Sequence, residues 1–409
     1  MNIETMDNVK KVLILGIGQT NFLGPLYKII KRSNPHLKFF LNRKKVLSDD
    51  ITDDNDLFNK QNENRFSVFS FFSLFKTIYL KVIFLTLIEE GFKKFLINAY
   101  FIIESIYLFD RKDKYDIYHY HFVNFKNLIS IPLLKKNRRI IVSFWGSDLL
   151  RNYDMINHFF VRYALLKADV ITIQSLDLKE FLVTKYGRDL YEKIKVIKFK
   201  LDQSIFENID SINNENDKSN FIDDHKVNIL VGHNANTANR HKEIIEALKD
   251  LSAETKAKIN LIFVFSYGIE NADFLKYYKG LLIEKLCEYK FQYVFIDSFL
   301  SQKEIAKLRK FANINIHLPV SDALSAAITE TMYAENLVIT GAWLPYGPFR
   351  RKGIFFSEIG DFNQLAEKVG SAVCDWDLKK RKLVGNRQKV IEEFLNQNIE
   401  EDWCSVYNF

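Results

Sequence analysis

The sequence predicts an α/β protein with two doubly wound parallel sheets that follow one another along the chain. Three observations support this fold class. Short apolar runs alternate with helix-length amphipathic segments, which is typical of a parallel sheet covered by helices. A polar stretch near the middle interrupts this alternation, which then begins again. The length of 409 residues also suits two domains.

The first domain is predicted to cover residues 1–205. Its first strand is the apolar run Val12–Leu15, which precedes a Gly16-Ile17-Gly18 turn and a helical pattern, as in a β-α unit. The acidic residues before this run do not resemble a signal peptide. Later strands and helices are expected at Asp116–His121, Lys126–Leu134, Arg139–Phe144, His158–Lys167 and Val170–Gln174.

The second domain is predicted to cover residues 226–385. Residues 206–225 are rich in Asn, Asp and Ser, so we expect an interdomain linker there. Strands are expected at Val227–Val231, Ile259–Phe265, Tyr293–Ile296, Ile314–Leu318 and Leu337–Thr340. Helices are expected at Lys242–Leu251, Tyr277–Tyr289, Gln302–Phe311 and Ala326–Ala334. Residues 386–409 are expected to form a C-terminal helix, and its packing back on the first domain stays open.

Composition narrows the possible functions. A formal charge of +7 suits an enzyme of phosphorylated donors, an anionic membrane surface, or neither, and is too small to indicate nucleic-acid binding. The three cysteines lie far apart, which indicates neither a zinc site nor a disulfide framework and fits a reducing cytoplasm. Lys76 and Lys81 interrupt the apolar stretch Phe66–Ile88, so we expect no transmembrane helix.

The aromatic block Phe66–Tyr107 has two possible interpretations. It follows a polar segment, residues 42–65, and is expected to form amphipathic helices. These helices either pack in a core and against each other, or present an exposed face to a bilayer or an apolar acceptor. Lys76, Lys81, Lys93 and Lys94 would flank such a face. The second interpretation predicts peripheral contact with the inner face of the cell membrane.

The clearest chemical signal lies between Leu318 and Ala334, where a buried strand is followed by a small-residue loop and a helix. The N–H groups at the start of this helix, near Ser325 and Ala326, would bind a diphosphate. Glu330 is placed to accept the hydroxyls of a ribose, and Asp322 lies in the loop, where it would meet a sugar. The structural alternative is a Ser N-cap with a solvated Glu.

These residues resemble the retaining GT-B glycosyltransferases, whose mark is two acidic residues separated by seven. Asp322 and Glu330 stand at the matching places, followed by Met332-Tyr333-Ala334 and a Val-Ile strand, although the first acidic residue is usually Glu. In the first half, Asp116–His121 and Ser143–Asp148 resemble the family's strand that ends in His-x-His and the next strand with its loop. The resemblance implies a donor cleft between two Rossmann-like domains.

Further site residues follow from the strand ends. We expect His121 to lie next to the donor sugar, because the carboxyl end of a strand faces the ligand crevice, although a satisfied core histidine is the alternative. Gly16 and Gly18 would let the donor approach the backbone; no glycine follows at the third place of a dinucleotide fingerprint, so NAD binding is not expected. Trp145 and Asp148 are placed on the acceptor side.

The loop after the first strand of the second domain carries the remaining candidates. The family places Arg directly after the loop glycine and Lys five residues later, whereas His233 and Ala238 stand here. The stretch resembles the loop of bacterial fucosaminyltransferases that act on lipid-linked sugars, and Asn234, Arg240 and Lys242 are the donor-binding candidates. Trp343 either shapes the acceptor or sugar pocket or only packs under its loop.

The resemblance implies hexosyl transfer from a nucleoside-diphosphate sugar to a hydroxyl acceptor, with retention and without a metal or other cofactor. Amino- and deoxy-hexosyl donors are included. A lipid-linked or surface-polysaccharide precursor is the expected acceptor. The alternatives are a nucleotide-sugar epimerase of the same fold and a non-catalytic binding partner in glycan assembly.

Overall fold

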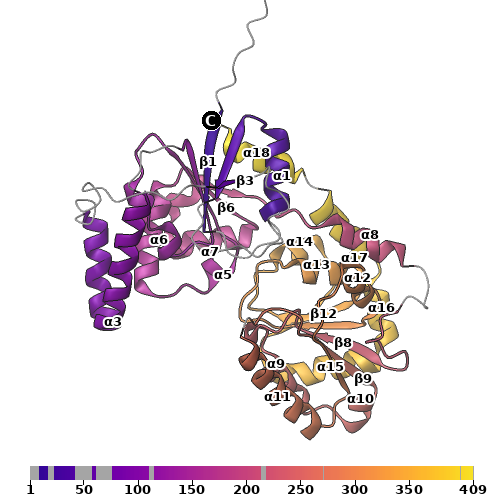
Figure 1. The fold of residues 1–409 in the computed structure, drawn as a ribbon. Helices are drawn as coiled ribbons and strands as arrows, with labels where there is room; N and C mark the ends of the chain where they lie inside the picture. Colours follow the sequence, from indigo (N-terminus) through magenta and orange to yellow (C-terminus); the bar gives the residue numbers. More distant parts are fainter. Residues whose placement is uncertain are drawn as a thin grey trace, which may run out of the picture. The chain divides into compact units, whose positions relative to one another are not determined.

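The structure is a computed structural model that describes residues 9–16, 23–41, 58–60, 76–109, 115–212, 218–269, 271–396 and 398–408. Two compact units divide the chain. The first unit contains residues up to Phe199 together with the C-terminal segment from Asn398, and the second contains Lys200–Gln397. Figure 1 shows the elements of each unit. The two predicted doubly wound sheets are confirmed.

The first unit contains a parallel sheet in the order β3-β2-β1-β4-β5-β6-β7. The strands are β1 (Lys10–Leu15), β2 (Leu37–Leu41), β3 (Phe58–Lys60), β4 (Ile117–His121), β5 (Arg139–Ser143), β6 (Val170–Ile173) and β7 (Ile194–Val196). Its α-helices are α1 (Leu23–Ser33), α3 (Thr77–Phe109), α4 (Phe125–Leu128), α5 (Ser147–Leu150), α6 (Met155–Lys167), α7 (Leu176–Tyr186) and α18 (Ile399–Tyr407). The strand order reverses between β1 and β4, so a crevice is expected at their carboxyl ends.

The second unit contains a parallel sheet in the order β10-β9-β8-β11-β12-β13. Its strands are β8 (Val227–Val231), β9 (Ile259–Val264), β10 (Tyr293–Ile296), β11 (Ile314–His317), β12 (Leu337–Gly341) and β13 (Ser357–Ile359). Its α-helices are α8 (Gln203–Ser211), α9 (His241–Leu248), α10 (Ala253–Ala257), α11 (Ala272–Glu288), α12 (Gln302–Phe311), α13 (Ala326–Tyr333), α14 (Gly347–Lys352), α15 (Leu365–Cys374), α16 (Trp376–Leu383) and α17 (Asn386–Val390). The order reverses between β8 and β11.

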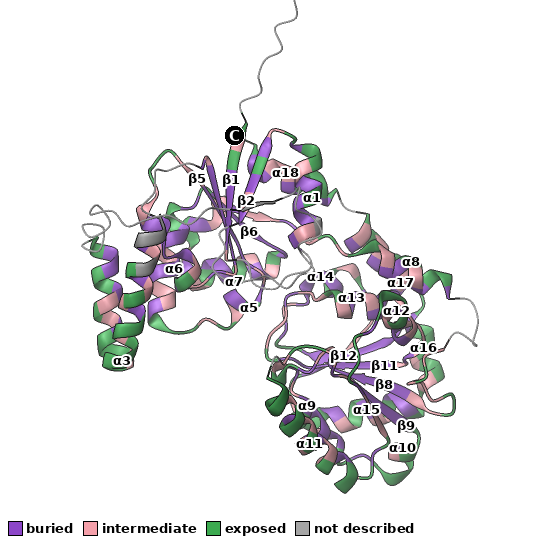
Figure 2. Cartoon of the chain, viewed as in Figure 1, coloured by how far each residue is buried: buried purple, intermediate pink, exposed green. Residues whose placement is uncertain are grey.

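Both sheets are buried because helices cover them. Strands β4, β6, β11 and β12 are buried at every position, so the polar residues of β4 and β11, among them His121 and His317, also lie inside the protein. In Figure 2 the strands are mainly in the buried colour and the outer helix faces in the exposed colour. All three cysteines lie in the described part of the chain, and each is unpaired.

The linker prediction needs correction. Residues 203–211, part of the expected linker and of the segment before it, form helix α8. Ile205, Phe206 and Ile209 on this helix are buried in a core of the second unit together with Tyr333. Sequence reasoning missed the helix because its apolar residues are few and stand beside the Asn- and Asp-rich stretch.

The last helix, α18, belongs to the first unit. Trp403 is 1% exposed, and its Nε1 donates a hydrogen bond to the carbonyl of Lys198 at 3.1 Å. Arg139 Nη2 donates to the carbonyl of Val406 at 3.0 Å. The helix therefore completes the core of the first unit, whereas residues 386–397 belong to the second.

Candidate functional site

The central candidate lies in the second unit, where the strand order reverses between β8 and β11. His233 follows β8, and His317 ends β11. Because the two parallel strands are neighbours, these histidines meet, with ring centroids 5.4 Å apart. The loop after β11 then leads to Asp322, Ser325 and the start of α13. Ligands of doubly wound sheets bind at such a reversal.

Asp322 is held by its Oδ2 atom. This oxygen accepts hydrogen bonds from the Tyr346 hydroxyl at 2.6 Å and from the Ser325 N–H at 3.0 Å. It also lies 3.6 Å from Nε2 of His317. Within the described part of the chain no hydrogen bond is found to Oδ1. Burial acts to raise the pKa of Asp322, but the contacts with His317, Tyr346 and Ser325 outweigh it and lower the pKa.

Ser325 begins helix α13 without the usual side-chain cap. Its hydroxyl makes no capping hydrogen bond, and Oγ is buried without a hydrogen-bond partner among the described residues. Asp322 Oδ2 binds the Ser325 N–H instead. The next residue, Ala326, is exposed at the first helical position, where an N–H group has no acceptor within the helix. Ser325 therefore stands at the N-cap position, but its side chain does not cap the helix as the structural alternative expected.

Glu330 is not a solvated residue. Its Oε2 accepts from Nε of Arg309 at 3.1 Å, and the exposed fractions of the two side chains are 14% and 7%. The sequence analysis did not select Arg309. It lies on α12, 21 residues before Glu330, and only the fold brings the two side chains together. Glu330 Oε1 has no hydrogen-bond partner in the described ranges.

The loop that follows β8 is held by its own asparagines. Asn234 Oδ1 accepts from the Asn236 N–H at 2.9 Å and from Nδ2 of Asn239 at 2.8 Å. Asn236 Oδ1 in turn accepts from the Ala238 N–H at 2.9 Å. The density of Asn in this loop thus has a structural cause, and the side-chain oxygen of Asn234 is already used within the loop.

The two cationic candidates of this loop differ in their surroundings. The guanidinium carbon of Arg240 lies 5.6 Å from the ring centroid of Trp343 and 5.1 Å from that of Phe362. Trp343 Nε1 donates to the carbonyl of Pro319 at 3.0 Å, so its indole both packs on the loop and supports Arg240. Lys242 is exposed on α9. Neither cation has an ion pair within the described residues.

In the first unit His121 lies at the reversal between β1 and β4, but it is not available as it stands. It is 0% exposed, and both ring nitrogens are hydrogen-bonded: Nδ1 with Trp145 Nε1 at 3.0 Å, and Nε2 with the Tyr27 hydroxyl at 2.7 Å. An indole N–H can only donate, so Nδ1 is the acceptor and the proton of neutral His121 resides on Nε2. The hydrogen bonds match the alternative of a satisfied core histidine, and the contact of His121 with the donor sugar stays a prediction.

His119, two residues earlier on β4, extends this network on the same face of the sheet, with its ring centroid 4.1 Å from that of His121. Its Nδ1 contacts the hydroxyls of Tyr27 and Tyr407 at 2.9 Å and 2.5 Å, and its Nε2 contacts Ser143 Oγ at 2.6 Å. Burial lowers the pKa of His119 well below its usual value, and proximity to His121 adds to this effect. Burial also lowers the pKa of His121 to about 3. Both rings are therefore neutral at physiological pH.

Asp148 and Trp145 shape the loop after β5. The buried Asp148 carboxylate accepts from the backbone N–H groups of Trp145, Gly146 and Val123 at 2.8–3.1 Å. The Trp145 ring stacks on Phe199, with centroids 3.9 Å apart and planes 4° apart. Asp148 is therefore a loop-forming residue, and contact of its carboxylate with an acceptor, as predicted, would break this arrangement.

Gly16 follows β1 with a φ of +76°, and a Cβ atom added there would lie 2.0 Å from the carbonyl oxygen of His121. Close packing between neighbouring strand ends thus requires glycine at this position. Gly18 lies outside the described residues. In the described part of the chain, no group of three or more His, Cys, Asp or Glu residues is placed to hold a metal ion.

Comparison with known proteins gives structural matches alone. No family model and no curated protein matches the sequence. Among solved structures, Anabaena HepE in complex with UDP and glucose matches with a TM-score of 0.62 at 12% identity, covering 97% of this chain and 98% of that one. The trehalose-6-phosphate synthase OtsA matches with a TM-score of 0.65 at 11% identity, covering 98% and 99%. A glycosyltransferase of Rickettsia africae matches with a TM-score of 0.62 at 16% identity, covering 98% and 99%.

The chain has the GT-B fold. At these identities the matches establish the fold alone, so the predicted resemblance is confirmed as a GT-B resemblance, and the likeness to fucosaminyltransferases stays a prediction. In this GT-B chain the candidate residues of the second unit gather around the reversal between β8 and β11. Those of the first unit gather at β1 and β4.

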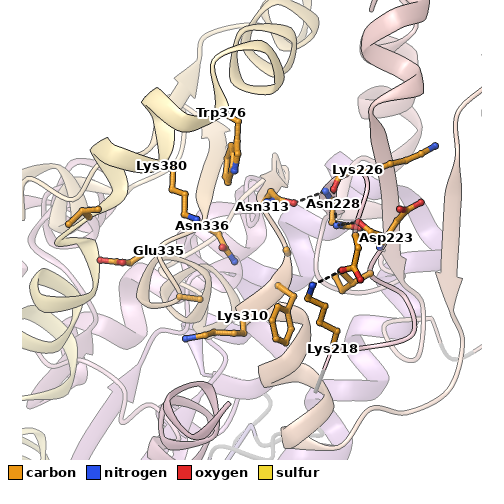
Figure 3. A pocket seen from close by; sticks show the side chains of 16 residues that line it. Lys218, Asp223, Lys226, Asn228, Lys310, Asn313, Glu335, Asn336, Trp376 and Lys380 are labelled. Atoms are coloured by element: carbon orange, nitrogen blue, oxygen red, sulfur yellow. Dashed lines mark hydrogen bonds and ion pairs between the residues drawn. The ribbon is translucent and has the colours of Figure 1, made fainter. Parts of the chain in front are cut away.

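The GT-B chain also contains a pocket of about 390 Å³ in the second unit, at the amino ends of the strands (Figure 3). Asn228 near the start of β8, and Asn313 and Asn336 just before β11 and β12, place it at the amino ends of the strands. Lys310, Lys380 and Trp376 also line it. Sequence reasoning missed this pocket because its lining comes from segments far apart in the chain. It is separate from the residues at the carboxyl ends.

Proposed function

We propose that this protein is a glycosyltransferase that moves a hexosyl, amino-hexosyl or deoxy-hexosyl group from a nucleoside-diphosphate sugar to a hydroxyl acceptor. The observation that carries the proposal is the position of Asp322, Ser325 and the start of α13 at the reversal between β8 and β11. The fold supports it, because structures with the same fold include HepE complexes with UDP-glucose and with UDP and glucose.

Each group would have a defined part in donor binding. The N–H groups at the start of α13 would bind the diphosphate, since a helix N-terminus carries partial positive charge. Asp322 Oδ1 would orient the sugar, while Oδ2 stays bonded to Tyr346 and Ser325. Glu330 Oε1 would accept from a ribose hydroxyl, while Oε2 stays bonded to Arg309.

The transfer is proposed to retain the anomeric configuration. The acceptor oxygen forms its bond to the sugar C1 on the face from which the diphosphate leaves. The bond from C1 to the phosphate oxygen breaks, and the acceptor proton passes to that oxygen. We propose that no metal is needed, because the helix N-terminus and neighbouring donor groups stabilise the leaving diphosphate.

We also propose a lipid-linked or surface-polysaccharide precursor as acceptor, with peripheral contact between α3 and a membrane. Within the described residues no helix is long and apolar enough to span a bilayer. Helix α3 bends at Gly91, which has a non-helical φ of 79° and ψ of 176°. Asn98 Nδ2 donates to Thr86 Oγ1 at 3.2 Å, although residues twelve apart in a straight helix would be about 18 Å apart. The two arms of α3 are therefore antiparallel.

The outer face of this α3 hairpin is unusually apolar. Large apolar side chains on it are 43–65% exposed: Leu80, Phe84, Leu87, Ile88, Phe92, Leu96, Ile97, Tyr100 and Ile103. On the first arm Leu80, Phe84 and Leu87 share one helical face, opposite the buried Tyr79, Val82 and Thr86. Figure 2 shows exposed positions along α3. An apolar stripe with lysines beside it suits a membrane interface. The rest of the aromatic block, residues 66–75, lies outside the described residues.

The donor proposal is tested by thermal stabilisation with a panel of UDP-, dTDP-, GDP- and ADP-sugars, followed by product analysis with a panel of acceptors. A donor at 100 times its dissociation constant should stabilise the protein by about 2.7 kcal/mol. Asp322→Asn should abolish transfer, and Glu367→Gln, an exposed change on α15, should leave it unchanged. Isomerisation of a donor without acceptor would instead indicate an epimerase. Failure of every nucleotide sugar to bind would refute the proposal.

A further inference from the structure

The candidate site contains buried polar atoms that no described residue satisfies. They are Nδ1 of His233, both ring nitrogens of His317, and Oγ of Ser325. His317 is 0% exposed, and its closest polar contact is Asp322 Oδ2, at 3.6 Å, which is longer than a hydrogen bond. His317 has the His233 ring 5.4 Å away between centroids and Asp322 at 3.6 Å, and Asp322 accepts from the Ser325 N–H, so these atoms belong to neighbouring residues.

Unsatisfied buried polar groups destabilise a fold. Each one costs about 1–3 kcal/mol, so native structures keep few of them, and those that remain call for an explanation. The other buried histidine pair of this chain, His119 and His121, uses all of its ring nitrogens in hydrogen bonds. His241 Nε2 is also buried without a partner, but both ring nitrogens are unsatisfied in His317, which favours a bound ligand there over packing alone.

The chemistry of the site favours an anionic ligand. The N–H groups at the start of α13 point out of the helix at this place, and protonated imidazoles and a hydroxyl are hydrogen-bond donors. The guanidinium of Arg309, the nearest buried cation, already pairs with Glu330. Ala238 stands where the resembling family has its lysine, and His233 where it has its arginine. Neither family position therefore carries a permanent cation here, which leaves Arg240, Lys242 and the histidines to supply the charge for a diphosphate.

We propose that His233 and His317 hold the diphosphate of the donor, with Ser325 Oγ as a neutral donor, and that a proton is taken up when the donor binds. This inference rests on the proposed function and names the groups that bind its leaving group. The two histidines take the place of the arginine and lysine.

The uptake of a proton follows from the surroundings of the His233 ring. Burial lowers the pKa of His233 to about 3; His317, Arg309 and His241 add to this effect, and Asp322 opposes it. The ring of Tyr346 stacks on His317 with a centroid distance of 6.4 Å. A diphosphate carries two negative charges, which favour the protonated form of a neighbouring imidazole. Donor affinity should therefore fall as the pH rises.

The experiment is calorimetric titration of the full-length protein with UDP-, dTDP-, GDP- and ADP-sugars between pH 5.5 and 8. The diphosphate of a nucleotide sugar is a diester and does not titrate in this range, so proton uptake reports on the protein. Titrations in buffers of different ionisation enthalpy give the number of protons taken up. For one proton we expect affinity to fall by up to about tenfold per pH unit in the lower part of the range, where the donor-bound ring holds its proton, and to level off at higher pH.

Variants identify the groups. His317→Gln and His233→Gln should each weaken binding about 10- to 100-fold, the effect of a hydrogen bond to a charged group, and should reduce proton uptake. Ser325→Ala removes one oxygen, and we expect it to weaken binding several-fold with no change in proton uptake. His225→Gln, an exposed change in the same unit, should alter neither quantity. Unchanged melting temperatures without ligand show that the variants fold.

The outcomes separate the two proposals. Binding without proton uptake, and with equal affinity in the histidine variants, would overturn the histidine assignment and leave the glycosyltransferase proposal standing. Loss of binding in Ser325→Ala but not in the histidine variants would also overturn it. If no nucleotide sugar binds, both proposals fail together.

Discussion

Nε of Arg309 and Oε2 of Glu330 lie 3.1 Å apart in an ion pair between α12 and α13 that is almost completely buried. The pair fixes the helix that carries the candidate donor site against its neighbour. It also fixes the side chain expected to hold the ribose. The sequence offers no sign of it, because the two residues are 21 positions apart on different helices.

The first prediction concerns this pair. Arg309→Met leaves a buried carboxylate without its partner and should destabilise the second unit by about 3–5 kcal/mol. The double variant Arg309→Met, Glu330→Met removes both charges and should be more stable than Arg309→Met alone. Urea unfolding of the two variants measures the difference. Equal stability of the single and double variants would show that the pair is not buried as described.

The second prediction concerns Asp322. The pKa of Asp322 is lower in the folded protein than in the unfolded chain, where it is near 4. The ionised carboxylate therefore stabilises the fold above about pH 4, and this stabilisation is lost as the pH falls further. The difference in unfolding free energy between wild type and Asp322→Asn should stay constant from pH 8 to pH 5 and shrink below about pH 4. Asp377→Asn, an exposed change on α16, should show no such dependence. A constant difference down to pH 2.5 would contradict the expectation.

Much of the fold could be predicted from the sequence, because buried parallel strands are short apolar runs that recur with helical segments. The strand that ends at His317 and the helix that begins at Ala326 are found within one residue of their expected places. Strand β2 (Leu37–Leu41) was missed. Its sequence, LKFFL, lies between polar residues and is too short to indicate its type.

The site was harder to predict than the fold. A motif places Asp322 and Glu330 but says nothing of the partners that the fold brings to them from other elements, such as Tyr346 and Arg309. His121 was assigned to the ligand crevice from its strand position. Whether a strand-end histidine faces a ligand or a neighbouring side chain depends on Trp145 and Tyr27, and a strand pattern does not contain that information.

The third prediction concerns the buried histidines. Burial lowers the pKa of His121 and His233 to about 3, that of His241 to about 4, and that of His119 well below its usual value. In the unfolded chain each would titrate near 6.5, so the stability of each unit should fall as the pH drops below 6.5, by up to about 1.4 kcal/mol per pH unit for each histidine. Melting at pH 7.5, 6.5 and 5.5 tests this. Titration of the His121 ring near 6.5 in NMR spectra would refute it.

The fourth prediction concerns Gly16. Alanine at this position places a methyl group against the His121 carbonyl at a positive φ, and we expect the first unit to lose about 2–4 kcal/mol of stability. Gly24→Ala is the matched control on α1, because a Cβ atom there has no neighbour within 4 Å. It should stabilise by roughly 0.5–1 kcal/mol. Equal effects of the two changes would contradict the close approach of β1 and β4.

The last prediction concerns the α3 hairpin. If its apolar stripe contacts a membrane, the protein should float with vesicles of phosphatidylcholine and phosphatidylglycerol. Phe84 and Phe92 are 62% and 65% exposed, so their replacement removes little folding energy but most of their contact with lipid. Phe84→Ser together with Phe92→Ser should weaken flotation by roughly tenfold or more, because each buried aromatic ring contributes about 1.5–3 kcal/mol.

Phe299→Ser, at a position that is 80% exposed in the second unit, should leave flotation unchanged. Equal flotation of all three proteins would place the membrane contact elsewhere. A wild-type protein that does not float but forms dimers through α3 would show that the apolar stripe binds a second copy of the chain instead of lipid.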